Sequence, residues 1–552
     1  MTDPKPSQTT AAFFVKCLEN EGVEYIFGVP GEENLAVMDA LLDSSIEFIT
    51  ARHEQGAAFM ADVYGRLTGR AGVCLATLGP GATNLITGVA DANMDHAPVV
   101  AIAGQAATHR LHKESHQVLD LEEMFRPITK YSARLLAPEV TAEIVRKAFK
   151  VAQTEKTGAC FIEFPENIAD MPAPEGMEPL WSKNPVMSAP TQDRINAAAE
   201  AISNAKHPII LAGHGVIRAC ASEQLAEFAA QLNIPVTNTF MAKGVVPFKH
   251  PTALGSAGLQ AKDYVGVGFD QADVIICVGY DLVEYHPYLW HPNKDRFIIH
   301  VDTQPAEVDA HYGVRVGVVG DIKQSLQRIA GKTTAHIGET LRPLRTALIE
   351  DMKEHADTAD FPVPPQKIIW DLRTAMALND IAICDVGAHK MWMARMFRCE
   401  QPNTCIISNG FASMGIAVPG AIAAKLAYPD RNVVAVTGDG GFMMNSQEIE
   451  TAMRLGLAIV ILVWTDSAYG LIEWKQMNHY GRASNITFAN PDFVKYAESF
   501  GAKGYRIQST EELLPTLKQA LADNTVSIID CPVDYAENLR LTAKLGETVF
   551  QL

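Results

Sequence analysis

The chain has 552 residues, of which 48% are hydrophobic and 20% charged, and this length is too great for one ordinary hydrophobic core. We therefore expect two to four globular domains. Acidic residues outnumber basic ones by 64 to 46, the net charge is −18, and the sequence has no long Lys/Arg run. This balance excludes a protein that binds the nucleic-acid backbone as its main role. No uncharged apolar run reaches the roughly 18 residues of a membrane span, so no membrane partner is expected.

The nine cysteines are dispersed and form no C-x-x-C pair. Such a pattern favours reduced thiols in a cytoplasmic protein over a disulfide framework or a zinc site. The N-terminal stretch MTDPKPSQTTAAFF has no basic region leading into an apolar core, so we expect no signal peptide.

Two proline-rich stretches divide the chain into three blocks. FPENIADMPAPEGMEP closes a block at residues 8–175, and HADTADFPVPPQ precedes a block at residues 365–540. The remaining block covers residues 190–345. These three ranges are the predicted domains.

Short apolar runs that end in glycine or a turn alternate with helical patterns in every block. The runs are YIFGVPG, AGVCLATLGPG and PVVAIAGQ in the first block, PIILAGHG, ADVIICVGY and RFIIHVDTQ in the second, and IAICDVG, NVVAVTGDG, LAIVILVWTD and VSIIDCPVD in the third. Continuous apolar strands that alternate with helices are typical of parallel sheets covered on both faces. The sequence therefore predicts an α/β protein with three doubly wound parallel-sheet domains, whose ligands bind beyond the carboxyl ends of the strands.

Two aspartates, Asp439 and Asp466, each follow one of the apolar runs in the third block. If the two strands are neighbours joined by a right-handed crossover, both carboxylates emerge at the same sheet edge. Gly438, Gly440 and Gly441 would let the backbone approach a ligand there, and a helix begins nearby. The arrangement suits a divalent cation that carries a phosphate group. The alternative is an ordinary strand-ending turn beside an ordinary loop acid.

The stretch from GDG to Asp466 resembles the thiamin diphosphate (ThDP) motif. The resemblance extends over nearly the whole chain, including the order of pyrimidine-binding, middle and diphosphate-binding domains, and is nearest to the acetolactate synthases of the catabolic, FAD-independent type. It implies that Asp439, Asp466 and the backbone carbonyl of Ala468 bind Mg²⁺.

The sequence RHEQGAAFMA places Glu54 where the family has its catalytic glutamate. There the carboxyl bonds N1′ of the aminopyrimidine and exchanges a proton near neutral pH, so we expect it to be buried. Without the resemblance, Glu54 could equally be a helix-start acid that is favoured by the helix dipole.

Further cofactor contacts follow from the same resemblance. Met414 matches the methionine that supports the bent form of ThDP, although a methionine in such a run is otherwise a core residue. His389 could also be a plain helix-start histidine, and the glycine-rich loops around Gly31 and Pro80 could be plain turns. The expected cofactor-binding residues are Gly31, Glu54, Pro80, Asn84, Gly387, Ala388, His389, Ala412, Met414, Gly438, Asp439, Gly440, Gly441, Asp466, Ala468 and Tyr469.

The segment HKESHQVLD contributes Gln117, which the resemblance places near the reacting centre as a second catalytic residue. An ordinary surface-loop glutamine is the alternative. His112 and His116 are spaced like a metal pair but lack a third ligand, so they do not predict a metal site.

In the family, the glutamate of one chain meets the diphosphate domain of another. The resemblance therefore implies a homodimer with active sites at its interface, commonly a dimer of dimers (homotetramer). It implies that two pyruvates are joined with loss of CO₂, through a hydroxyethyl-ThDP carbanion, to give 2-acetolactate.

Several features bear on which ThDP reaction is catalysed. GYDLVEYHPYLW matches the catabolic enzymes and lacks the arginines of FAD-binding relatives, so FAD is not expected, although AGHGVIRA could still hold a nucleotide phosphate. By direct register, the tryptophan that favours 2-ketobutyrate in anabolic enzymes would fall on Lys475, one residue after Trp474. Pyruvate is therefore the simpler acceptor.

Three other functions are alternatives to this reaction. The enzyme alternative is another ThDP-dependent 2-keto acid decarboxylase or acyl transferase, such as one that resembles sulfoacetaldehyde acetyltransferase. A non-catalytic regulatory relative is disfavoured because Glu54, Asp439 and Asp466 are all present. An NAD-dependent Rossmann enzyme is excluded because no G-x-G-x-x-G opens a helix with an acid some twenty residues later.

Overall fold

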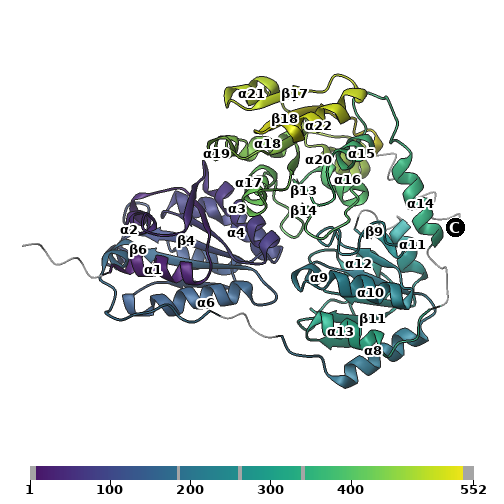
Figure 1. Cartoon of the computed structure of the whole chain (residues 1–552), viewed down its shortest axis with the longest axis horizontal. Coiled ribbons are helices and arrows are strands. Elements are labelled where there is room, and N and C mark those ends of the chain that lie inside the picture. Colours follow the sequence, from purple (N-terminus) through teal and green to yellow (C-terminus); the bar gives the residue numbers. More distant parts are fainter. Residues whose placement is uncertain (1–7, 183–186, 259–263, 337–341, 539–552) are drawn as a thin grey trace, which may run out of the picture. The chain divides into compact units, whose positions relative to one another are not determined.

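The computed structural model describes residues 8–182, 187–258, 264–336 and 342–538. They divide into two compact units (Figure 1). The first unit comprises the described residues of Met1–Pro185 together with Gly410–Tyr428 and Asn445–Leu455. The second unit comprises the rest. None of the helices in the described ranges combines the length and the apolar character that crossing a membrane requires.

The first unit is built on a parallel sheet of six strands in the order β2-β1-β3-β4-β6-β5. The order reverses between β1 and β3, which makes the sheet doubly wound and marks the loops after these two strands as the expected ligand position. The strands are β1 (Tyr25–Gly28), β2 (Glu47–Thr50), β3 (Gly72–Ala76), β4 (Val99–Gln105), β5 (Tyr131–Arg134) and β6 (Ala159–Pro165).

Helices cover both faces of this sheet. On one face, α1, α2 and α6 form an apolar core with the strands, and on the other α3 and α4 pack together, with α17 against α3 (Figure 1). The helices are α1 (Thr10–Asn20), α2 (Leu35–Leu41), α3 (Glu54–Thr68), α4 (Pro80–Met94), α5 (Leu121–Phe125), α6 (Thr141–Gln153), α7 (Glu166–Asp170), α17 (Ala417–Ala427) and α19 (Glu448–Arg454), with short 3-10 turns at Glu32–Asn34, Thr108–Arg110, Arg126–Ile128 and Pro138–Val140.

The second unit contains two more parallel six-stranded sheets. Their orders are β12-β11-β10-β7-β8-β9 and β14-β13-β15-β16-β18-β17, which reverse between β10 and β7 and between β13 and β15. The strands are β7 (Pro208–Ala212), β8 (Val236–Asn238), β9 (Ala253–Ser256), β10 (Val274–Val278), β11 (Phe297–Asp302), β12 (Val314–Val319), β13 (Ile381–Cys384), β14 (Cys405–Ile407), β15 (Val433–Gly438), β16 (Val460–Thr465), β17 (Lys503–Arg506) and β18 (Ser527–Pro532).

The helices of the second unit connect these strands. They are α8 (Gln192–Asn204), α9 (Gly215–Arg218), α10 (Ser222–Leu232), α11 (Tyr264–Gln271), α12 (Pro287–Trp290), α13 (Ile322–Ala330), α14 (Arg342–Lys353), α15 (Pro365–Ala375), α16 (Ala388–Met396), α18 (Asp439–Asn445), α20 (Gly470–Tyr480), α21 (Phe493–Ser499) and α22 (Leu513–Ala522), with a 3-10 turn at Thr510–Glu512. Separate apolar cores lie on the middle sheet and on the third.

All ten apolar runs are strands, which confirms the predicted class of three doubly wound parallel-sheet domains. Most of the remaining strands carry polar residues that weaken the pattern, and β14 is only three residues long. Central strand β6, for example, contains Glu163, whose carboxylate is buried between Gln105 (2.7 Å) and Arg134 (3.0 Å). The sheets fall within the blocks 8–175, 190–345 and 365–540, but these boundaries stay a prediction.

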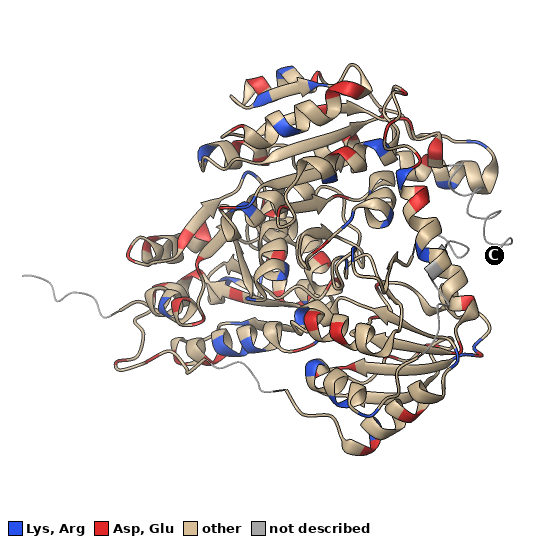
Figure 2. Cartoon of the chain, turned by 45° about the vertical axis from the view of Figure 1, so that its right-hand side comes forward, with Lys and Arg blue, Asp and Glu red and all other residues tan. Residues whose placement is uncertain are grey.

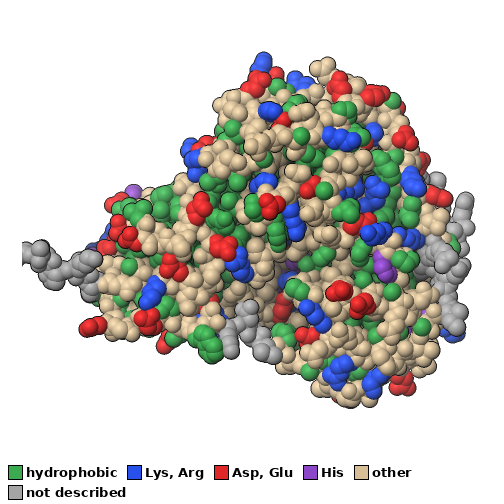
Figure 3. Space-filling model, in the orientation of Figure 1, with side chains coloured by type: hydrophobic (Ala, Val, Ile, Leu, Met, Phe, Trp, Pro, Cys, Tyr) green, Lys and Arg blue, Asp and Glu red, His purple; other side chains and the backbone are tan. Residues whose placement is uncertain are grey.

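Charged side chains are spread over the chain. Acidic and basic residues are interspersed along the helices of both units (Figure 2), and they mix over the face shown in Figure 3. This distribution agrees with the reading of the net charge of −18 as a general surface property.

Candidate active site

Asp439 and Asp466 lie together at the carboxyl ends of two neighbouring strands of the third sheet, as predicted. Strands β15 and β16 are parallel neighbours, with Gly438 paired to Trp464, so the residues that follow leave the sheet side by side. The backbone N–H of Asp466 donates to Oδ2 of Asp439 at 3.2 Å. The crossover differs from the prediction in one respect, because it contains two short helices, α18 and α19, and α18 begins at Asp439 itself.

The Asp439 carboxylate is held by four N–H groups. Oδ2 accepts from the backbone of Asp466, from the backbone of Ser467 at 2.7 Å and from the Asn490 amide at 2.7 Å, while Oδ1 accepts from Gly440 at 2.8 Å. Burial raises the pKa of Asp439, and these hydrogen bonds oppose that rise. The side chain is therefore fixed, with Oδ1 the less occupied oxygen.

Within the described ranges the second carboxylate, Asp466, accepts one hydrogen bond, from the Ala468 N–H to Oδ1 at 3.3 Å. Burial, and next the negative charge of Asp439, raise the pKa of Asp466 to about 7. The two carboxylates repel each other, and little water reaches them. A bound cation would offset this repulsion.

The donor set fits Mg²⁺. Asp439, Asp466 and the Ala468 carbonyl offer oxygen atoms alone, which this hard cation prefers. Within the described ranges no group of three or more His, Cys, Asp and Glu side chains could hold a metal. The predicted set has only two such side chains and takes its third ligand from the backbone.

The loop after β13 provides a cradle for a polar group beside this edge. His389 is buried and its Nε2 has no hydrogen-bond partner within the described chain, while burial lowers the pKa of the ring to about 3 and keeps it neutral. A Cβ on Gly387 would lie 2.7 Å from the ring, and one on Gly440 would lie 2.9 Å from Tyr469. The buried Nε2 of His389 and the glycines beside it lie where the strand order reverses. This arrangement fits a bound diphosphate, which could accept a hydrogen bond there.

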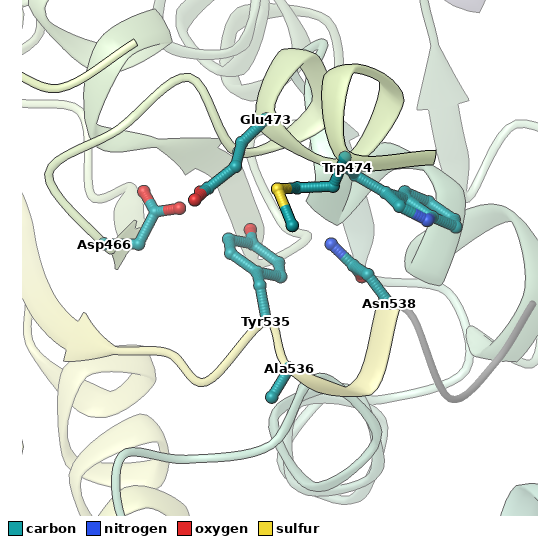
Figure 4. Close-up of a pocket in the computed structure, with 8 residues that line it drawn as sticks. Asp466, Glu473, Trp474, Tyr535, Ala536 and Asn538 are labelled. Carbon is teal, nitrogen blue, oxygen red and sulfur yellow. The ribbon is translucent and has the colours of Figure 1, made fainter. Parts of the chain in front are cut away.

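A cavity of about 320 Å³ adjoins Asp466 (Figure 4). Glu473 and the Tyr535 hydroxyl lie on the Asp466 side, and Trp474 and Asn538 lie at the other end. The Trp474 Nε1 is buried and has no hydrogen-bond partner within the described residues. The cavity leaves room beside the second carboxylate.

Glu54 opens α3 directly after β2, in the first unit. His53 caps the helix, its ring accepting from the Gln55 N–H, and the Asn84 amide donates to Oε2 of Glu54 at 2.9 Å. A Cβ on Gly81 would lie 3.4 Å from Oε1, so the glycine keeps that oxygen accessible. In the described chain Glu54, the first residue of α3, is half-buried and not buried as predicted.

The other predicted residues of the first block lie on or against the loops after β1 and β3, between which the strand order reverses. A Cβ on Gly31 would lie 2.4 Å from the Thr77 side chain, so the loop after β1 packs on the loop that leads to Pro80. Gln117 lies against Gly79 in that same loop, is exposed, and has a left-handed φ of 59°. The structure thus gathers Gly31, Pro80, Asn84 and Gln117 near Glu54.

Ala412 and Met414 lie on a loop that packs within the first unit and not within the second. Met414 is half-buried and lies outside the apolar cores, so it is not the core methionine of the alternative interpretation. The predicted site residues therefore form two groups, one on each unit, and their roles stay predictions.

Some residues of these groups were not expected from the sequence. Asn490 and Ser467 hold Asp439, and buried Glu448 accepts the N–H groups of Arg52 (3.1 Å) and His53 (3.0 Å) just before Glu54. No spacing rule singles out Asn490, which lies 51 positions after its partner. Glu448 is one of several acids in a helical pattern and could be recognised only from its burial.

Comparison with known proteins identifies the family. Residues 8–124 match the model of the thiamine pyrophosphate enzyme N-terminal TPP binding domain, residues 195–329 the central domain, and residues 385–531 the C-terminal TPP binding domain. The chain is 38% identical to the acetolactate synthase of Bacillus subtilis over 97% of its own length and 94% of that protein. The chain belongs to the acetolactate synthase family.

Other relatives agree with this family. The catabolic acetolactate synthase of Raoultella terrigena is 36% identical over 97% of both chains, and the acetolactate synthase large subunit of Corynebacterium glutamicum is 34% identical over 94% of this chain and 86% of its own length. These matches confirm the resemblance drawn from the motifs and the prediction that the protein is a ThDP-dependent enzyme. The binding of Mg²⁺ stays a prediction.

Proposed function

We propose that the protein is an acetolactate synthase that joins two molecules of pyruvate, with loss of CO₂, to give 2-acetolactate. The observation that carries this proposal is the full-length similarity to acetolactate synthases, including a catabolic one. Three residues that the chemistry requires follow strands of the two outer sheets in the order of the chain: Glu54 follows β2, Asp439 follows β15 beside the reversal of the third sheet, and Asp466 follows the neighbouring β16.

Bound ThDP supplies the nucleophilic carbon and the electron sink of this chemistry. Glu54 holds a proton for N1′ of the aminopyrimidine, and because Asn84 occupies Oε2, Oε1 is the oxygen that exchanges it. Asp439, Asp466 and the Ala468 carbonyl would hold Mg²⁺. The neutral Nε2 of His389 would bond the diphosphate and satisfy a nitrogen that otherwise has no partner.

The middle sheet supports the proposal that the enzyme works without FAD. At its reversal point, the His214 N–H donates to both oxygens of buried Glu284 at 3.0 Å, and the Gly213 and Gly215 N–H groups donate to carbonyls of Val278 and Gly279. Burial and the charge of Asp281 raise the pKa of Glu284 to about 8. The Glu284 side chain thus takes the position where a nucleotide phosphate would bind. We expect a colourless purified protein; a stoichiometric flavin spectrum would contradict this part.

Pyruvate as acceptor is consistent with helix α20. Lys475 is exposed, while Trp474 is buried and faces the cavity of Figure 4. Lys475 stands at the position that the resemblance assigns to the tryptophan that favours 2-ketobutyrate in anabolic relatives, so this chain has no tryptophan there.

The proposed enzyme is a homodimer with active sites at its interface, further paired as a dimer of dimers. Large apolar side chains next to the predicted contacts are exposed, among them Phe411 (44%), Tyr469 (40%) and Ile472 (47%). A second chain would bury them. Glu54→Gln and Asp439→Asn are mixed under exchange conditions, at ThDP·Mg²⁺ concentrations too low to occupy the Asp439→Asn site. About a quarter of the activity should be restored, because half of the dimers then contain one intact site. No recovery despite subunit exchange would place both groups in one chain's site.

A cytoplasmic location is part of the proposal. All nine cysteines are free thiols, and all except Cys220 are buried. Reducing conditions keep such a set unpaired.

The deciding experiment incubates the protein with ThDP, Mg²⁺ and pyruvate and measures acetolactate as acetoin after acid treatment. Acetolactate that depends on both cofactors supports the proposal. Its absence, together with turnover of sulfoacetaldehyde or a branched 2-keto acid, would reassign the protein to another ThDP reaction.

A further inference from the structure

A buried ionic cluster joins helices α3 and α4 in the first unit. The Arg66 guanidinium contacts Asp62 at 2.6 Å, Asp91 at 2.9 Å and Asp95 at 2.8 Å, and all four side chains are at most 2% exposed. Three carboxylates face one cation. Since apolar residues of similar size would often stabilise such a position at least as well, the cluster calls for a reason beyond stability.

Two of the three aspartates also hold a loop distant in sequence. Oδ1 of Asp95 accepts from the Gly410 N–H, and Oδ1 of Asp91 accepts from the Ser413 N–H at 3.2 Å. Asp62 contacts Arg66 through both oxygens and accepts from no backbone group of this loop. The cluster therefore has two members that reach the loop and one that does not.

The loop in question, residues 410–415, has a backbone that needs support. Ala412 has a φ of 58° and Gly415 a φ of 90°. A residue with a Cβ rarely adopts the left-handed region unless its surroundings enforce it. Ala412 and Gly415 lie on either side of Met414 in the sequence. The Asn445 amide donates a hydrogen bond to the Gly415 carbonyl at 3.0 Å.

We propose that Asp91 and Asp95 are positioning residues for the cofactor, which act through the 410–415 loop, with Arg66 fixing their orientation. Because each carboxylate gives one oxygen to Arg66 and the other to a loop N–H, the conformation of Ala412 and Met414 depends on both contacts at once. The inference rests on the proposed function, in which Ala412 and Met414 contact ThDP.

The test replaces Asp91 and Asp95 separately by Asn and uses Asp62→Asn as the matched control. An Asn has one side-chain oxygen, which can accept from Arg66 or from the loop N–H. Its NH₂ group then faces the other donor and cannot accept a hydrogen bond from it. Asp62→Asn disturbs the same cluster without touching the loop. One folded variant of the two is enough for the test.

Three quantities are measured for each variant: ThDP·Mg²⁺ affinity by tryptophan fluorescence, amide hydrogen exchange over residues 410–414, and the melting temperature of the apo-protein. We expect Asp91→Asn and Asp95→Asn to weaken ThDP·Mg²⁺ binding about 10- to 100-fold and to speed exchange in the loop. Asp62→Asn should leave both within about twofold, whatever its melting temperature.

Equal loss of affinity in Asp62→Asn, or melting-temperature changes with unchanged affinity and exchange, would overturn the positioning role. None of these measurements requires acetolactate to be formed. A failure of the proposed reaction and a failure of this inference are therefore distinguishable.

Discussion

The two groups of predicted site residues are built in opposite ways. On the first unit, Glu54 is half-buried and, among the residues that the structure describes, receives one side-chain hydrogen bond, from Asn84. On the second unit, Asp439 is buried, receives four N–H groups, and lies beside another carboxylate whose pKa is raised to about 7.

The contrast follows from what each carboxylate has to do. A group that exchanges a proton must reach both protonation states, so a few weak contacts suit Glu54. Asp439 has to stay in place as a metal ligand, and its four N–H donors hold it there and oppose the rise of its pKa by burial. The following predictions test that difference, beginning with the largest effect.

Replacing Glu54 by Gln removes the exchangeable carboxyl while keeping the Asn84 contact possible. We expect acetolactate formation to fall about 1,000-fold, within the range for loss of an acid–base group, with ThDP binding retained. Steady-state rates and ThDP titration measure the two effects. The control is Glu47→Gln, because Glu47 is an exposed glutamate. Substantial activity in Glu54→Gln would refute the proton-exchange role of Glu54.

Asp439→Asn should act on binding more than on the chemical step. Loss of one charged ligand should weaken ThDP·Mg²⁺ binding about 100-fold, corresponding to about 3 kcal/mol for an interaction with a charged group. Titration with ThDP at several Mg²⁺ concentrations measures the change. Equal ThDP affinity with and without Mg²⁺ in the wild-type protein would remove the basis of this prediction.

Asp466→Asn tests the second charge through pH. With a pKa raised to about 7, Asp466 is largely protonated below that pH, so Mg²⁺ must displace a proton and its affinity should fall about tenfold from pH 8 to pH 6. The Asn variant should bind Mg²⁺ more weakly at pH 8 but with a flatter pH profile.

The apo-protein should show the corresponding effect on stability. Because the folded-state pKa of Asp466 is raised, its contribution to stability is present at low pH and is lost as pH rises through about 7. Asp466→Asn should therefore raise the apo melting temperature at pH 8 relative to wild type and have less effect at pH 5. Identical pH profiles in the two proteins would show that the second charge is immaterial.

The smallest effect is expected for Asn84→Ala. Removal of the side-chain hydrogen bond from Asn84 to Glu54 should cost about 1 kcal/mol, or roughly fivefold in turnover, with little change in ThDP affinity. A loss as large as that of Glu54→Gln would mean that Glu54 is held as rigidly as Asp439.

Much of the fold was readable from the sequence because the central strands are uninterrupted apolar runs. The strands that were not recognised are short, polar or charged, as in β5 and β17, or contain a buried acid, as in β6. A buried carboxylate such as Glu163 is compatible with a core only through partners that the linear pattern does not show.

The candidate site divides in the same manner. The spacing of Asp439 and Asp466 sufficed to bring them together, because a parallel crossover returns each strand to the same edge. The contacts of Asn490 with Asp439, of Glu448 with the turn before Glu54, and of Asp91 and Asp95 with the 410–415 loop could not be foreseen.

The sequence by itself determined the class of fold, the family and the identity of the ionisable groups, since these depend on residue type and on short repeating distances along the chain. Only the tertiary structure decided how firmly each group is held and which oxygen remains available. It also placed the segment with Ala412 and Met414 in the first unit. The physical reason is that hydrogen-bond partners and burial are set by packing between segments tens to hundreds of residues apart, on which the local pattern carries no information.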